Sequence, residues 1–141
     1  MTTASYKNIG SGPRRSFQVS FGLCAGYGDG VKEFTVDDAK AAIHGWMEAR
    51  IVAKRPYLTG HLSAGQTVYA WPNDDGTAGE GDEPGGLFLG EVSVLYDADR
   101  IDEEVREQLN DLAAALGNAL EQTRVYVAYG NDCLLYTSDA A

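Results

Sequence analysis

The stretch Phe17–Leu23, FQVSFGL, decides how the fold begins. Its apolar residues occupy every second position, and this period of two is typical of a strand with one buried face. Glycines then follow at Gly26, Gly28 and Gly30, where the chain can continue neither a strand nor a helix. The sequence therefore predicts a half-buried strand over residues 17–23 that runs into a glycine-rich loop.

A helix is predicted after this loop. Thr35 offers a side-chain oxygen as N-cap, and Asp37 and Asp38 suit the positive first turn of a helix. Pro56 marks where the helix must have stopped. We expect helix one over residues 36–52, with an apolar face formed by Val36, Ala39, Ile43, Trp46 and Met47.

A second strand and helix repeat this pattern. Residues 87–96, LFLGEVSVLY, predict a strand, Asp99 is the expected N-cap of helix two, and residues 124–129 predict the last strand. The core stripe of helix two is expected to consist of Ile101, Val105, Leu109, Leu112, Leu116 and Leu120. Between the halves, residues 67–71 are strand-like, and residues 72–86, rich in acids and glycines, predict a hydrophilic loop.

The predicted order of elements is β-α-β-β-α-β. Right-handed crossovers turn this order into one four-stranded antiparallel sheet with both helices on one face, an α+β, ferredoxin-like architecture. The other face of the sheet would carry Gln18, Ser20, Glu91, Ser93, Tyr126 and Ala128. A polar and aromatic face without helix cover is either wet or buried against another subunit, and we favour the second.

Both ends of the chain are expected to lie outside the folded domain. Residues 1–16 are polar and lack the apolar segment of a signal peptide, which predicts a disordered lead. Residues 134–141 show no periodicity and no cap and resemble a translated adapter, so we expect a non-native tail. A single domain would then span residues 17–133.

The composition indicates an acidic globular domain. The 141 residues include 21 Asp and Glu against 11 Lys and Arg, a formal net charge of −10. Phosphate contacts need clustered Lys and Arg, so no nucleic-acid partner is expected. No apolar run approaches the roughly 20 residues that span a bilayer, so no membrane partner is expected either. Two cysteines are too few for a disulfide scaffold.

Metal binding and nucleophilic catalysis find little support in the sequence. His44 and His61 have no second ligand at zinc spacing. The acids between positions 74 and 83 lack the alternation of a calcium loop, so a solvated loop is favoured over a cation site. Ser63 does not stand at nucleophile-elbow spacing, and Cys24 has no predicted base beside it. We therefore expect no metal site.

Glu91 is the more informative residue. It stands in the middle of a predicted strand, where a carboxylate costs free energy unless a cationic or hydrogen-bonding group meets it. Tyr69 and Trp71 on the neighbouring strand can supply aromatic faces to the same region, and rings with a carboxylate hold a cationic ligand. The alternative is that Glu91 pairs with Arg124 or with a neighbouring subunit.

The string from Tyr57 to Tyr129 resembles the small phage-encoded S-adenosylmethionine (SAM) lyases, formerly called SAM hydrolases. The shared features are a strand with Tyr69, a strand with Glu91, and Glu121-Gln122-x-x-Val125-x-Val127 after the second helix. The insertion between Tyr69 and Glu91 is longer than the family's linker, so Glu80, at a more compact spacing, stays an alternative to Glu91. The layout is also similar to the PII-like, trimeric ferredoxin-like group, whose members bind nucleotide-type ligands between subunits.

The resemblance implies a homotrimer that converts SAM to 5′-methylthioadenosine (MTA) and homoserine lactone in the cytoplasm of a phage host. The substrate's own carboxylate would attack its γ-carbon, so no cofactor, metal or enzyme nucleophile is implied. The implied catalytic residues are Glu91, as the orienting carboxylate, and Tyr69, as a ring in contact with substrate. Further substrate contacts are implied for Gly26, Gly28, Trp71, Ser93 and Tyr126. Two other classes stay open: a PII-like protein that binds a nucleotide without turnover, and a structural oligomer without a ligand.

Overall fold

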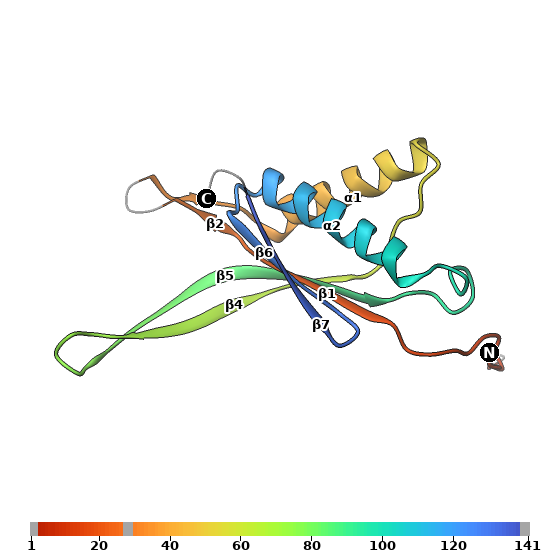
Figure 1. Cartoon of the computed structure of the whole chain (residues 1–141), viewed down its shortest axis with the longest axis horizontal. Coiled ribbons are helices and arrows are strands. Elements are labelled where there is room, and N and C mark those ends of the chain that lie inside the picture. The colour runs from red at the N-terminus through yellow and green to blue at the C-terminus, as the bar shows by residue number, and fades with distance from the viewer. Residues whose placement is uncertain (1–2, 27–29, 139–141) are drawn as a thin grey trace.

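A computed structural model describes residues 3–26 and 30–138 of the chain. Two helices, α1 (Val36–Val52) and α2 (Asp102–Ala119), lie over one face of a long antiparallel sheet, as Figure 1 shows. The five strands of this sheet are, in spatial order, β4 (His61–Pro72), β5 (Ala78–Glu91), β1 (Ser16–Gly22), β6 (Arg124–Tyr129) and β7 (Asp132–Thr137). Two short strands, β2 (Cys24–Ala25) and β3 (Lys32–Glu33), pair separately. Neither described helix combines the length and the apolar character needed to cross a membrane.

The core lies between the helices and the sheet. Strand β1 buries Phe17, Val19 and Phe21 and turns the residues between them to the other face, as its period of two predicts. Helix α2 buries most of its expected stripe, but Ile101, just before its first turn, is 55% exposed. The buried stripe residues are Val105, Leu109, Leu112, Leu116 and Leu120. Removal of these apolar side chains from water holds the two layers together.

The two helices begin differently. At α1 the Thr35 hydroxyl accepts a hydrogen bond from the Asp38 N–H, and the Asp38 carboxylate accepts one from the Thr35 N–H. The predicted cap of helix one is therefore confirmed. The predicted cap Asp99 of helix two is wrong, because the chain stays in turns up to Ile101, which is the N-cap residue and makes no side-chain cap bond.

The segment 72–86, predicted to be a hydrophilic loop, is a strand over most of its length. Strands β4 and β5 form one long hairpin, whose turn is made by residues 73–77. Gly76 adopts a φ of +86°, which costs glycine little, and the Asn73 N–H donates to the Thr77 carbonyl at 2.8 Å. Strand β1 ends opposite Gly85, so residues 66–84, called the arm below, project from the sheet as two strands (Figure 1).

Strand β5 also ends earlier than the predicted strand 87–96. Its last residue is Glu91, and Ser93 lies in a turn, where its hydroxyl accepts hydrogen bonds from the N–H groups of Leu95 and Tyr96. Ser93 is therefore not on the helix-free face of the sheet. The residues on that face include the predicted Gln18, Ser20, Glu91, Tyr126 and Ala128, together with Leu87, Leu89 and Leu135.

Residues that we assigned to the chain ends make contacts with the domain. Strand β7 includes residues 134–137, which pair with β6, so the sheet has five strands and the predicted four-stranded sheet is wrong. The Arg15 carbonyl accepts from the Val92 N–H at 2.9 Å, and its guanidinium donates to the carbonyls of Asp97 and Arg100. The α+β architecture with two helices and an antiparallel sheet is confirmed, whereas an adapter origin of residues 134–141 stays a prediction.

Candidate functional site

The residues predicted for the site lie in two places within one chain. Tyr69 pairs with Gly81 in the arm, and Glu91 lies ten positions beyond Gly81 along β5. At roughly 3.3 Å per residue, this separation is on the order of 30 Å. Trp71 is beside Tyr69 and Ser93 is near Glu91. One chain therefore does not bring Tyr69 and Glu91 into a single site.

Glu91 has partners of its own at the far end of β5. Its Oε1 lies 2.5 Å from Arg14 Nε, and its Oε2 accepts a hydrogen bond from the Ser16 hydroxyl at 2.7 Å. These contacts hold the pKa of Glu91 below its ordinary value. The hydrogen bond from Ser16 has the larger effect and the contact with Arg14 the smaller one. Both oxygens of the Glu91 carboxylate thus have partners. The basic residue paired with Glu91 is Arg14 and not Arg124, the partner considered from the sequence.

In the arm, the rings of Tyr69 and Trp71 on β4 pack against the backbone of two glycines on β5. The ring centroids of Tyr69 and Trp71 lie 6.0 Å apart. Each ring covers the glycine opposite it, since a Cβ at Gly81 would fall 2.7 Å from Tyr69 Cζ, and one at Gly79 would fall 2.1 Å from Trp71 Cε2. Glycine at both positions lets the rings lie flat on β5, and 42% of Tyr69 and 46% of Trp71 stay exposed.

Tyr69 connects this pair to an acidic side chain nearer the sheet. Its hydroxyl donates a long hydrogen bond, 3.5 Å, to Glu83 Oε1. Partial burial first, and then the negative charges of Glu83 and Asp82, raise the pKa of Tyr69 above its ordinary value. The phenol therefore stays protonated at neutral pH and acts as a donor.

A cavity of about 570 Å³ lies at the base of the arm, where β4 and β5 meet the end of β1. This volume is in the range of small-molecule sites. Its polar side chains include Ser20, Ser63, Glu83, Gln122, Arg124 and Tyr126, and glycines of β1, β4 and β5 form part of its wall. The predicted Tyr126 lines this cavity, whereas the predicted Tyr69 lies outside the lining and contacts Glu83, which is part of it. We call it the arm-base cavity.

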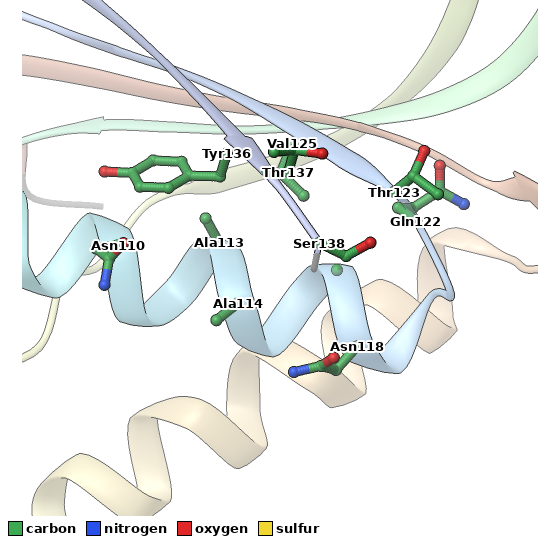
Figure 2. Close-up of a pocket in the computed structure, with 11 residues that line it drawn as sticks. Asn110, Ala113, Ala114, Asn118, Gln122, Thr123, Val125, Tyr136, Thr137 and Ser138 are labelled. Carbon is green, nitrogen blue, oxygen red and sulfur yellow. The ribbon is translucent and has the colours of Figure 1, made fainter. Parts of the chain in front are cut away.

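A second cavity, of about 450 Å³, lies between α2 and strands β6 and β7. Figure 2 shows Ala113, Ala114 and Asn118 of α2 on one side, and Tyr136 of β7 on the other. Its lining carries amides and hydroxyls but no charged side chain, and it contains none of the predicted site residues. The arm-base cavity, with a carboxylate and a guanidinium, is therefore the better candidate for a charged ligand.

Two other predictions concern the glycine loop and metals. Gly28 lies outside the described residues. Gly26 has a φ of +89°, and a Cβ there would fall 2.9 Å from the Gly30 carbonyl oxygen, so this position requires glycine for the turn itself. In the described part of the chain, no three His, Cys, Asp or Glu side chains gather closely enough to hold a metal ion.

Sequence reasoning missed Glu83 because it placed that residue in a loop. The usable signal was the alternation of Gly79, Gly81, Glu83 and Gly85, which has the period of a strand. The second signal was Asp75-Gly76, a dipeptide typical of hairpin turns. Together they would have predicted two paired strands and placed Glu83 close to Tyr69.

Comparison with known proteins supports the fold. No protein-family model matches the chain, and no curated protein sequence matches it. A solved structure of a phage SAM lyase in complex with S-methyl-5′-thioadenosine has a TM-score of 0.66 at 17% sequence identity, over 97% of this chain and 99% of that one. A phage SAM lyase in the apo state has a TM-score of 0.60 at 15% identity, over 96% and 98%. The resemblance to phage SAM lyases is therefore confirmed at the level of the fold.

Proposed function

We propose that this protein is a SAM lyase that converts SAM to MTA and homoserine lactone. The observation that carries the proposal is the likeness in fold, along nearly the whole of both chains, to a phage SAM lyase in complex with S-methyl-5′-thioadenosine, which is MTA. The sequence motifs built on Tyr69 and Gln122 point to the same family.

The arm-base cavity is the proposed site. SAM carries a sulfonium and an ammonium group against one carboxylate, so a protein with a net charge of −10 attracts it. Glu83 offers a carboxylate to the ammonium group, and the rings of Tyr69 and Tyr126 offer π-faces to the sulfonium and the adenine. We therefore assign the orienting carboxylate to Glu83 in place of Glu91.

The proposed chemistry needs little from the protein. A carboxylate oxygen of SAM forms a bond to Cγ, the Cγ–S bond breaks, and its electron pair goes to sulfur. The negative and positive charges cancel in this step, so apolar rings around the sulfur favour the transition state over the charged substrate. The ammonium keeps its charge throughout, and Glu83 can hold it without opposing the reaction. The chain's main task is to hold the carboxylate close to Cγ.

We further propose that the active form is a homotrimer joined through the helix-free face. That face exposes 38% of Leu89, 53% of Tyr126 and 55% of Leu135. In addition, the arm is a two-stranded ribbon, which is marginally stable in water by itself. Exposed apolar side chains on a sheet face commonly mark a protein interface. A neighbouring copy would cover this face and support the arm.

Incubation of the purified protein with SAM, followed by chromatography for MTA, tests the proposed function. MTA formation at a rate above that of SAM alone supports the lyase. Tight binding of SAM without MTA would instead indicate a binding or sequestering protein. Neither binding nor turnover would leave the structural oligomer as the remaining class.

A further inference from the structure

Resting on the proposed function, we propose that Arg124 binds the α-carboxylate of the substrate in the arm-base cavity. Gln122 and Glu83, in the same cavity, would bind its α-ammonium group. Together these three side chains would form a subsite for the amino-acid end of SAM. The subsite would select ligands that carry a free amino acid over those that end at the thioether.

Arg124 differs from the other arginines in its surroundings. All seven arginines lie in the described residues, and six of them have a carboxylate within 4 Å: Arg14, Arg15, Arg50, Arg55, Arg100 and Arg106. Within that part of the chain Arg124 has no such partner, although acids outnumber basic residues by 21 to 11. It begins β6 on the helix-free face and lines the cavity. Its guanidinium is therefore available to an anionic group of a ligand, which it suits by its forked geometry.

The hydrogen bonds of the Gln122 side chain fix its amide in an orientation that leaves the oxygen free to accept a hydrogen bond from a cationic group. Its Nε2 donates to the carbonyls of Cys24 and Leu120, both at 2.9 Å. Because both N–H bonds are used on carbonyls, Oε1 is the atom that faces away from them, and it lies 2.5 Å from the place where a Cβ of Gly22 would stand. Gly22 lines the cavity as well. The cavity wall therefore presents a fixed acceptor in addition to the carboxylate of Glu83.

This pattern of one guanidinium and two acceptors matches the zwitterionic end of an α-amino acid. It also has a consequence for the reaction. The substrate carboxylate loses its charge as it attacks Cγ, so a contact with Arg124 is stronger in the substrate than in the transition state. Arg124 should therefore tighten substrate binding without raising kcat, and its loss should leave kcat unchanged or raise it. Homoserine lactone has no carboxylate, so it loses this contact and is released.

The test measures the affinity of two probes by isothermal titration calorimetry. S-adenosylhomocysteine keeps the amino-acid end and has no sulfonium to expel, whereas MTA lacks the amino-acid end. For Arg124→Gln we expect the affinity for S-adenosylhomocysteine to fall about 10- to 100-fold, as for loss of a charge-assisted contact, and the affinity for MTA to stay within about twofold. Arg124→Lys should recover part of the loss. Arg14→Gln, an exposed arginine at the far end of the same face, is the matched control and should change neither affinity.

Each other outcome would overturn the proposal. Equal loss of both probes in Arg124→Gln would show a general effect on the cavity, and no loss of either would show that the guanidinium is not used. Binding of MTA but not of S-adenosylhomocysteine by the wild type would remove the subsite and leave the proposed function standing. Binding of neither, together with no turnover of SAM, would remove both. In the active enzyme, Arg124→Gln should raise KM about tenfold or more, with kcat unchanged or higher.

Discussion

Tyr69 and Glu83 face each other across the β4–β5 hairpin, with the phenol oxygen 3.5 Å from Glu83 Oε1. This contact links the aromatic pair of the arm to the cavity at its base, which Glu83 lines. Glu91, on the same strand and on the same face, has no such link, because it lies at the other end of the strand, where it is bound to Arg14 and Ser16. The two glutamates thus offer a direct comparison.

Glu83→Gln and Glu91→Gln distinguish the two possible positions of the orienting carboxylate. We expect Glu83→Gln to lower kcat/KM for SAM about tenfold or more, because it removes the charge that we propose to hold the substrate ammonium. Glu91→Gln should change it less than about twofold. Steady-state kinetics of MTA formation measures both. A loss of kcat/KM in Glu91→Gln alone would instead assign the orienting carboxylate to Glu91, as the sequence motif implied.

Arg50 joins the two helices and should be needed for stability. It is only 3% exposed, donates to Glu107, Asp111 and the Pro56 carbonyl, and lies 5.7 Å from the centroid of the Trp46 ring. Arg50→Met keeps most of the apolar volume but removes these bonds. We expect a loss of about 2 kcal/mol in the free energy of unfolding, below the range for a fully buried pair because both carboxylates are half exposed.

Urea denaturation followed by circular dichroism measures this loss. Arg55→Gln is the control, since Arg55 contacts the same Glu107 but is itself half exposed. It should cost less than about 0.5 kcal/mol. An Arg50→Met variant as stable as the wild type would show that the helices do not depend on this cluster.

The same cluster predicts a loss of stability in acid. The hydrogen bond from Arg50, aided by the charges of Arg50 and Arg55, lowers the pKa of Glu107 from its ordinary value of 4.5. A lowered folded-state pKa means that the carboxylate stabilises the fold above the unfolded pKa and loses this contribution as pH falls through the folded one. The urea midpoint should therefore fall as pH drops below about 4.5, and it should fall less in Arg50→Met. An equal fall in both proteins would contradict this origin.

The helix-free face should control the assembly state. Leu89 lies within that face, opposite Gln18 of β1 and His61 of β4. We expect light scattering to give the mass of three chains for the wild type and of one chain for Leu89→Lys, because a lysine there places an unpaired charge in the interface. Val52→Lys, at the end of α1, is the control and should keep the mass of the wild type. A monomeric wild type would contradict the trimer.

The sequence predicted the elements whose signal is local. Phe17, Val19 and Phe21 have one apolar face, and Thr35 has a capping partner three residues away, so β1 and the start of α1 followed directly. The arm could not be predicted from composition, because acids and glycines are rare in strands. What makes it a strand is the cover that Tyr69 and Trp71 give to the glycines opposite, a contact between two strands rather than a property of one.

The candidate site depends on the same contact between strands, so the sequence could point to only part of it. Tyr69, Trp71 and Tyr126 lie in or beside one region, and Glu91 lies at the other end of β5. The sequence spacing from Tyr69 to a glutamate says nothing about distance until the hairpin register is known. The register pairs Glu83 with Thr67, two residues before Tyr69, and so places its carboxylate near the phenol.

Incubation with SAM in water enriched in ¹⁸O, followed by mass spectrometry of early products, tests the proposed lyase activity most directly. We expect MTA together with homoserine lactone that carries no ¹⁸O, since both oxygens of the lactone come from the substrate carboxylate. Homoserine labelled at its γ-oxygen would mean that water attacks Cγ, and a complete absence of MTA would mean that the protein does not cleave SAM at all.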